Sequence, residues 1–143
     1  MSDPFDLQRF VTAQDRVYAA VLDELAHGQK RTHWMWFVFP QLAGLGHSAM
    51  AERYAISGLG EASAYLAHPV LGPRLRECTE RTNAVTGRSA HDIFSSPDDM
   101  KFRSSMTLFA EVEKDGGTFG AALARYFAGE KDRRTMEILA QRH

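Results

Sequence analysis

SPDDMKFRSSMTLFAEVEK, residues 96–114, contains the clearest helix start in the chain. Ser96 suits the N-cap and Pro97 the first helical position, and two aspartates follow where the helix dipole favours negative charge. Phe102, Met106 and the apolar residues after them then fall on one arc of a helix. The stretch predicts a long helix and a helical fold.

Start and stop signals of the same kind divide the rest of the chain into helices. Asp3 and Pro4 open an amphipathic helix that continues to Gly28. The other expected helical segments are 32–39, 48–57, 61–67, 73–85, a brief turn from 89, 118–128 and a last helix from 132. Residues 32–39 also fit a buried strand. We find no strand alternation, repeat or linker, so the sequence predicts an all-α fold: a single compact orthogonal multi-helical domain over residues 1–143, with seven to eight helices.

The composition of the chain argues against several classes of function, nucleic-acid binding and membrane insertion among them. With 143 residues, 44% of them hydrophobic, the chain can bury a core of its own. Its 17 basic and 18 acidic side chains provide no excess charge for nucleic acid or an anionic membrane surface. The longest apolar run, WMWFVF, is too short to span a bilayer, and the first residues, MSDPFD, are unlike a signal peptide. We expect a cytoplasmic protein with no nucleic-acid or membrane partner.

Motifs for metals and cofactors are not found. The six histidines have no HxxxH or HxxE spacing, and no Walker or dinucleotide motif is present, so we expect neither a metal nor a cofactor. The single cysteine, Cys78, cannot form an internal disulfide and is predicted to be a small apolar core residue.

Lys101 is the main anomaly of the 96–114 helix. It lies with Ser105 inside the apolar arc, and Asp98 falls near it one turn earlier. Burying an unpaired ammonium is costly, so this lysine needs a partner or access to water. It could pair with Asp98, extend to the edge of the core, or face a polar cavity that holds an anionic ligand.

The stretch THWMWFVFPQLAGLGHS, residues 32–48, raises a similar question. Its aromatic residues, Trp34 among them, are most simply core. Gly46 permits unusual backbone angles before the helix start at Ser48, so LAGLGHS could offer backbone N–H groups to an anion, although glycines are also ordinary turn residues there. The polar neighbours that favour a binding role are Lys30, His33, Gln41 and His47.

Together the two segments predict one helix-lined polar pocket for an anionic small molecule, a nucleotide or a phosphorylated metabolite. The predicted ligand-binding residues are Lys30, Trp34, Gln41, Gly46, Ser48, Lys101 and Ser105, and the candidate catalytic residues are His33, His47 and Asp98. In this interpretation Lys101 neutralises the anion, Trp34 stacks on it, and a histidine serves as acid or base if the ligand is hydrolysed.

Two alternatives remain open at this point. A helical protein-interaction module, similar to an antitoxin, would show an exposed apolar patch and a fully paired Lys101. In a purely structural alternative, the polar groups only satisfy one another within the core. The sequence defines neither the reaction nor the oligomeric state.

The blocks GQKRTHWMWFVFPQLAGLGHS and DDMKFRSSMTLF, with DPFDLQRFVTAQ before them, resemble a bacterial family of uncharacterised small proteins, often mislabelled "calpastatin". The resemblance spans nearly the whole chain and implies a cytosolic, all-helical single domain. It implies no reaction, substrate or catalytic residue. The calpastatin label is physically inconsistent with this chain, because such a calpain inhibitor would be long, polar and disordered.

Overall fold

The computed structural model describes residues 3–141, apart from the side chain of Lys114. Ten α-helices and one 3-10 turn form this part of the chain, with an isolated parallel bridge between Leu42 and Ile56. The all-α prediction is confirmed, but the helices outnumber the seven to eight expected. The domain limits of 1–143 stay a prediction, since the four terminal residues, His143 included, lie outside the described part.

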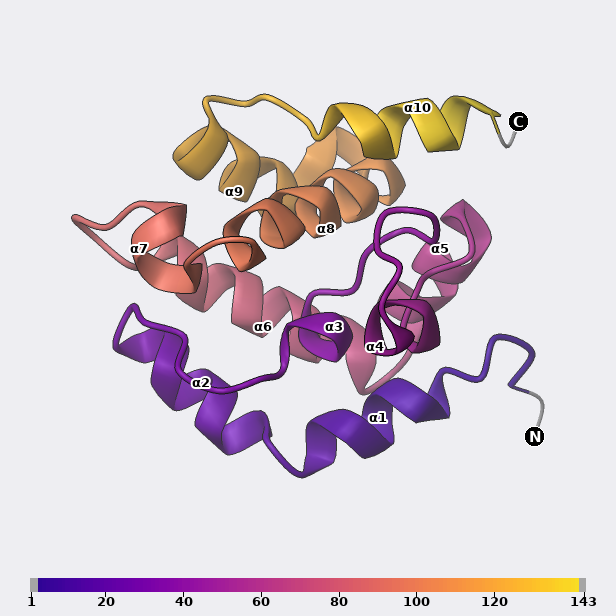
Figure 1. Cartoon of the computed structure of the whole chain (residues 1–143), viewed down its shortest axis with the longest axis horizontal. Helices are drawn as coiled ribbons and strands as arrows, with labels where there is room; N and C mark the ends of the chain where they lie inside the picture. The colour runs from indigo at the N-terminus through magenta and orange to yellow at the C-terminus, as the bar shows by residue number, and fades with distance from the viewer. Residues whose placement is uncertain (1–2, 142–143) are drawn as a thin grey trace.

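Figure 1 shows how the helices are arranged. They are α1 Gln8–Asp15, α2 Tyr18–Ala26, α3 Met35–Val38, α4 Ala49–Arg53, α5 Leu59–Ala67, α6 Leu71–Asn83, α7 Ala90–Phe94, α8 Asp98–Val112, α9 Gly117–Phe127 and α10 Arg133–Gln141. Within residues 3–141, no helix is long and apolar enough to cross a membrane.

Helix α8 is the centre of the fold. It packs against α5, α7, α9 and α10 (Figure 1). Residues 104–109 are all buried, and six consecutive residues cover every side of a helix. Thr107 is one of these buried residues, and its hydroxyl accepts the backbone N–H of Asp132 at 2.8 Å, just before α10.

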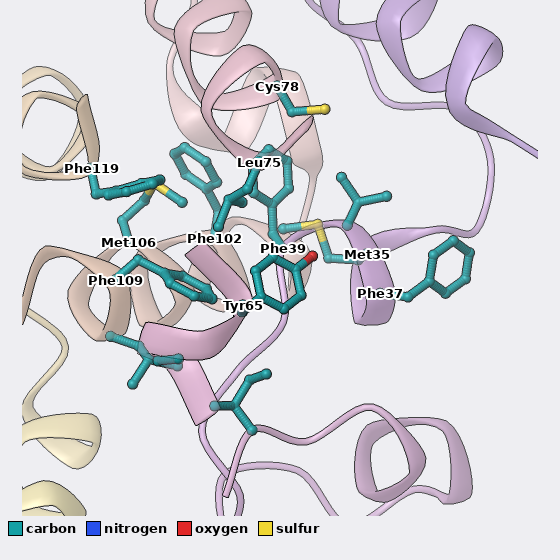
Figure 2. Close-up of a cluster of buried hydrophobic side chains, with 14 of the residues drawn as sticks. Met35, Phe37, Phe39, Tyr65, Leu75, Cys78, Phe102, Met106, Phe109 and Phe119 are labelled. Carbon is teal, nitrogen blue, oxygen red and sulfur yellow. The ribbon is translucent and has the colours of Figure 1, made fainter. Parts of the chain in front are cut away.

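Aromatic side chains join α8 to its neighbours in the core (Figure 2). The Phe102 ring meets Phe39 edge to face, with centroids 5.0 Å apart, and stacks on Phe94 at 4.7 Å. Phe109, two turns further along, contacts Tyr65 at 5.4 Å. Such pairs add about 0.5–1.5 kcal/mol each beyond burial alone. They hold the 32–48 segment and α7 against the first half of α8.

The prediction of one helix over residues 3–28 is wrong. The chain breaks at Val17, where φ is −127° and ψ is −3°. The predicted N-cap at Asp3 is also wrong, because α1 begins only at Gln8 and has Leu7 at its N-cap. The Asp3 carboxylate still accepts the backbone N–H groups of Leu7 and Gln8 at 2.8 and 3.0 Å. The break lets α1 pack against α3 while α2 packs against α6. Buried Gln14 anchors α1 by donating to the Phe37 carbonyl at 2.7 Å.

Three predicted N-caps are confirmed. The Ser48 hydroxyl accepts the third N–H of α4 at 3.1 Å. Ser89 forms a capping box with Asp92, so the expected brief turn is a helix, α7. The Asp132 carboxylate accepts the backbone N–H of Thr135 at 2.9 Å and caps α10.

Besides Asp3, three predicted caps are wrong. Thr118 does not cap α9, which begins at Gly117 with Gly116 at the N-cap position. Thr32 does not cap α3, which has Trp34 at its N-cap, because the Thr32 hydroxyl donates to Glu24 instead. Ser96 does not cap α8, which begins at Asp98 with Pro97 at the N-cap position. Residues 35–38 are helical, so the strand alternative for that stretch is also excluded.

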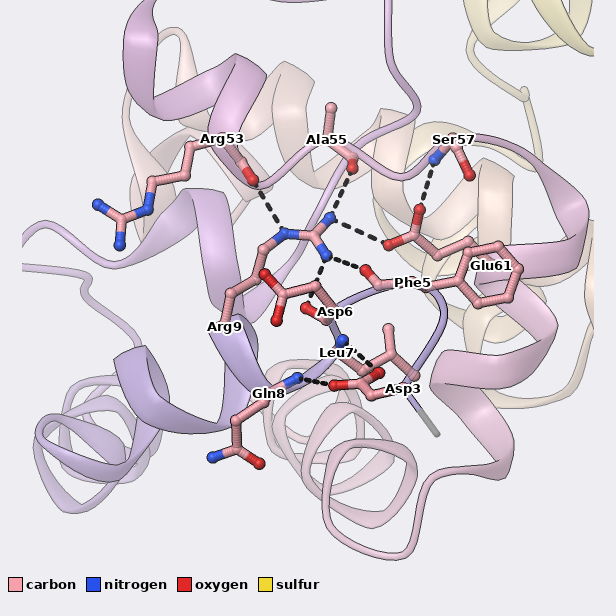
Figure 3. Close-up of polar contacts among 10 residues, drawn as sticks. All are labelled: Asp3, Phe5, Asp6, Leu7, Gln8, Arg9, Arg53, Ala55, Ser57 and Glu61. Carbon is pink, nitrogen blue, oxygen red and sulfur yellow. Dashed lines mark hydrogen bonds and ion pairs between the residues drawn. The ribbon is translucent and has the colours of Figure 1, made fainter. Parts of the chain in front are cut away.

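Arg9 fastens the N-terminal segment to the turn between α4 and α5 (Figure 3). Its guanidinium donates to the carbonyls of Arg53 at 2.9 Å and Ala55 at 3.0 Å, and it pairs with Glu61 at 3.0 Å. It also donates to two carbonyls of its own segment, those of Phe5 and Asp6. The Nε and both Nη atoms of Arg9 therefore donate to acceptors within the fold.

Candidate functional site

A pocket of about 480 Å³ lies between the loop before α4, the N-terminal half of α8, and the start of α10. Five residues of the predicted site line it together: Gln41, Gly46, His47, Ser48 and Lys101. The structure therefore brings the LAGLGHS loop and the Lys101 turn of α8 to one place, as their sequence patterns predicted.

Short backbone contacts hold the LAGLGHS loop in position. The N–H of Ile56 donates to the Gln41 carbonyl at 2.9 Å, and the Ile56 carbonyl accepts the N–H of Ala43 at 2.8 Å. A Cβ on Gly46 would lie 2.6 Å from the Cβ of Ala51, so glycine is needed for the loop to pack on α4. The Gly46 signal in the sequence has a structural cause, and the Ser48 hydroxyl is used as a cap.

Asp98 is shared by two lysines. Lys30 Nζ lies 2.9 Å from Asp98 Oδ2, and Lys101 Nζ lies 3.5 Å from Asp98 Oδ1. The Lys30 side chain is 8% exposed and that of Lys101 26%. Each ammonium also lies over an indole ring, Lys30 over Trp34 at 5.2 Å and Lys101 over Trp36 at 5.3 Å. Lys101 therefore has both a partner and access to the pocket, whereas Lys30 is enclosed.

Other predicted site residues lie outside this pocket. Trp34 and Ser105 are fully buried. The Trp34 indole donates to Glu24 at 3.0 Å, and a ring enclosed in the core cannot stack on a ligand in the pocket, so the expectation for Trp34 is wrong. Ser105 faces the core, where its hydroxyl has no hydrogen-bond partner among the described residues. His33 is exposed but does not line the pocket, and Asp98 reaches it only through Lys101.

Glu24 is a buried carboxylate that the sequence analysis missed. It accepts the backbone N–H groups of Arg31 at 2.6 Å and Thr32 at 3.0 Å, the Thr32 hydroxyl at 2.6 Å, and the Trp34 indole. Burial alone would raise the pKa of Glu24, but these hydrogen bonds outweigh it and hold the pKa below its usual range. Glu24 thus fixes the start of the 32–48 segment and removes Trp34 from any ligand role.

Two charged residues of the pocket were not predicted as site residues. Asp132 was predicted only as a helix cap, and Arg134 was not predicted at all, yet both line the cavity. The Arg134 side chain is exposed and belongs to no ion pair within residues 3–141. The pattern DRR was a local signal for a basic helix start, but it does not show that α10 returns to α8.

The fold and the pocket define a small all-α protein built round one buried central helix, with a polar cavity beside that helix's N-terminal half. The chain belongs to the family described as "Protein of unknown function (DUF1810)", whose profile matches residues 4–139. It is similar to the conserved hypothetical protein Rv1873 from Mycobacterium tuberculosis, with 59% sequence identity and a TM-score of 0.95. That match covers 96% of this chain and 99% of the other. The resemblance to a bacterial family of uncharacterised proteins is confirmed.

Comparison with functionally curated proteins found no match. In the part of the chain that the structure describes, no three His, Cys, Asp or Glu side chains are placed to hold a metal ion.

Proposed function

We propose that the protein binds an anionic small molecule, a nucleotide or a phosphorylated metabolite, in the pocket between the LAGLGHS loop, α8 and α10. One observation carries the proposal: Lys101, Arg134 and His47 come from three separate segments to one cavity of about 480 Å³. Lysine and arginine bind phosphate by charge-assisted hydrogen bonds, and a cavity of this size matches small-molecule sites.

The charges around the pocket support an anion. Arg134 has no carboxylate partner within residues 3–141, and Lys101 shares its carboxylate with Lys30. Asp132 also lines the pocket, but one of its oxygens accepts both the backbone N–H and the hydroxyl of Thr135. Arg134 and Lys101 are therefore the groups available to an oxyanion.

The surface supports a small ligand over a protein partner. A helical interaction module needs a contiguous exposed apolar patch. Among the described residues, Met100 is the one large hydrophobic side chain classed as exposed, at 46%, and it belongs to the rim of this pocket. A single apolar residue is too little for a stable protein interface.

His47 is the pocket group suited to proton transfer, since imidazole is the commonest general acid or base in enzymes. The proposal therefore extends to hydrolysis of the bound ester with His47 as the acid or base. Asp98 has a positioning role in this scheme, because it holds Lys101 at the pocket edge.

A thermal-shift screen tests binding, with phosphate, AMP, ADP, NAD, ADP-ribose and sugar phosphates as probes. A ligand at about 100 times its Kd adds roughly 2.7 kcal/mol, which raises the midpoint by several degrees. We expect a shift that Lys101→Met and Arg134→Gln abolish. Arg133→Gln is the matched control, because Arg133 is next in sequence but its exposed side chain lies 3.7 Å from Glu137 and does not line the pocket.

The same panel can refute the proposal. No shift with any probe, or equal shifts in Arg133→Gln and Arg134→Gln, contradicts binding at this site. Once a probe binds, product release by wild type and His47→Ala tests the hydrolysis step, with His33→Ala as the control. Equal turnover by wild type and His47→Ala would exclude the proposed acid or base.

A further inference from the structure

A second pocket, of about 500 Å³, lies between α1, α3 and the end of α4. It shares no lining residue with the first pocket. Its walls carry three arginines, Arg9, Arg16 and Arg53, and its apolar surface includes Phe37 and Tyr54. The pocket thus combines cationic and aromatic side chains.

The three arginines differ in whether their guanidinium groups already have partners within the fold. Arg9 donates to four carbonyls and pairs with Glu61, so its guanidinium is fully used. Arg16 and Arg53 are exposed, and neither belongs to an ion pair in the described part of the chain. Figure 3 shows that the Arg53 guanidinium points away from the cluster that Arg9 organises. Arg16 and Arg53 are therefore available to a ligand.

Only one acid lines this pocket. Asp6 is on its rim, and the Asp6 backbone carbonyl, not its carboxylate, accepts a hydrogen bond from Arg9 at 2.8 Å. Two free arginines exceed this single carboxylate, so the unpaired charge of the pocket is positive. Arginine's planar fork suits the oxygens of a phosphate or carboxylate.

The apolar part of the pocket is rigid. The Phe37 and Tyr54 rings pack at 5.4 Å with an interplanar angle of 59°, and each is less than 8% exposed. The Arg53 guanidinium lies 5.4 Å over the Tyr54 ring, which fixes its distance from the apolar surface. A ligand with an apolar body beside its anionic group would match both the arginines and the apolar wall, which includes the half-buried Val17.

We propose that this pocket binds a small organic anion with a phosphate or carboxylate attached directly to an aromatic ring. The oxyanion lies between Arg16 and Arg53, and the ring rests against Val17 and the edge of Phe37. This site is separate from the phosphate site proposed above, and either could exist without the other.

Phenyl phosphate is the probe, and inorganic phosphate and phenol each supply one half of this ligand alone. Binding is measured by calorimetry and by chemical-shift changes of backbone amides. We expect phenyl phosphate to bind, with shifts centred on α1 and α4, and each half to bind at least about tenfold more weakly. Inorganic phosphate binding as tightly as phenyl phosphate would overturn the proposal.

Arg16→Gln and Arg53→Gln locate the site. Each should raise the Kd for phenyl phosphate about tenfold, in keeping with the loss of a charge-assisted hydrogen bond. Both side chains are exposed, so the thermal midpoint should not change, which shows that the variants fold. Arg134→Gln in the other pocket is the matched control. An unchanged Kd for phenyl phosphate in both Arg16→Gln and Arg53→Gln, or loss of binding in Arg134→Gln, refutes the assignment.

Discussion

Lys30 and Lys101 share Asp98, and replacing each lysine by methionine separates the fold from the site. Methionine keeps the length of the lysine stem and removes the charge. The two lysines differ in geometry: Lys30 is 8% exposed and 2.9 Å from Asp98, whereas Lys101 is 26% exposed and 3.5 Å away. The same chemical change should therefore have unequal effects on stability.

The expected magnitudes follow from burial. Removal of one partner from a buried pair costs about 3–5 kcal/mol, and because Asp98 is 19% exposed and keeps Lys101, we expect Lys30→Met to cost about 2 kcal/mol. A partly exposed pair contributes about 0–1 kcal/mol, and a cation–π contact about 0.5–1 kcal/mol. Methionine at 101 also adds apolar contact on the buried side of α8. Lys101→Met should remain within about 1 kcal/mol of wild type.

Urea unfolding followed by far-ultraviolet circular dichroism measures both free energies, and an unchanged m-value shows that the comparison is valid. Lys131→Met is a control, because Lys131 forms an exposed pair with Glu111 at 2.7 Å and should cost less than about 0.5 kcal/mol. A loss for Lys101→Met equal to that for Lys30→Met would refute the reasoning. It would make Lys101 a structural residue and remove the main support for an anion site.

Further predictions concern three buried residues, Glu24, Gly72 and Cys78. Glu24→Ala leaves the Trp34 indole N–H without its acceptor and should cost about 2–4 kcal/mol in urea unfolding. The pKa of Glu24 is lower in the folded state than in the unfolded state. The contribution of this carboxylate to the free energy of unfolding is therefore complete above the unfolded pKa and is lost as the pH falls through the folded pKa. The free energies of unfolding of wild type and Glu24→Gln should converge over this acid range. A Cβ on Gly72 would overlap the Leu66 carbonyl oxygen, so Gly72→Ala should lower the thermal midpoint by at least several degrees. Burial raises the pKa of Cys78 to about 12, so a thiol reagent should modify it only after unfolding, and rapid modification of the native protein would contradict its burial.

Signals within the sequence predicted most of the helices. The predictions failed where contacts between distant segments determine the structure. Caps at Ser48, Ser89 and Asp132 depend on residues within one turn, so the sequence alone reveals them. The break at Val17 depends on which helices α1 and α2 cover, and the burial of Thr107 depends on the return of α10. Neither event has a signature within its own segment.

The candidate site was predicted in part for the same reason. Lys101 was conspicuous because a cation within an apolar arc is unusual, and the structure places it at a pocket edge. Glu24 carried a comparable signal, since it lies three residues after Val21 and one before Leu25 in a predicted amphipathic helix. Because Glu24 accepts the Trp34 indole N–H within the core, the prediction that Trp34 stacks on a ligand fails. Arg134 could not be identified, because nothing near it in sequence indicates that α10 meets α8.

The structural and functional interpretations of Lys101 are compatible, because Asp98 faces two cations. One carboxylate cannot neutralise two ammonium groups, so Asp98 leaves part of the charge of Lys30 and Lys101 unpaired. Lys30 is 8% exposed and does not line the pocket, so an anion in the pocket meets Lys101 and not Lys30. An anion bound there, as proposed, would pair with Lys101 without displacing Asp98 from Lys30, and its binding would stabilise the native fold. The Lys30–Asp98 pair, which holds α8 to the segment before α3, is thus compatible with the ligand-binding role proposed for Lys101.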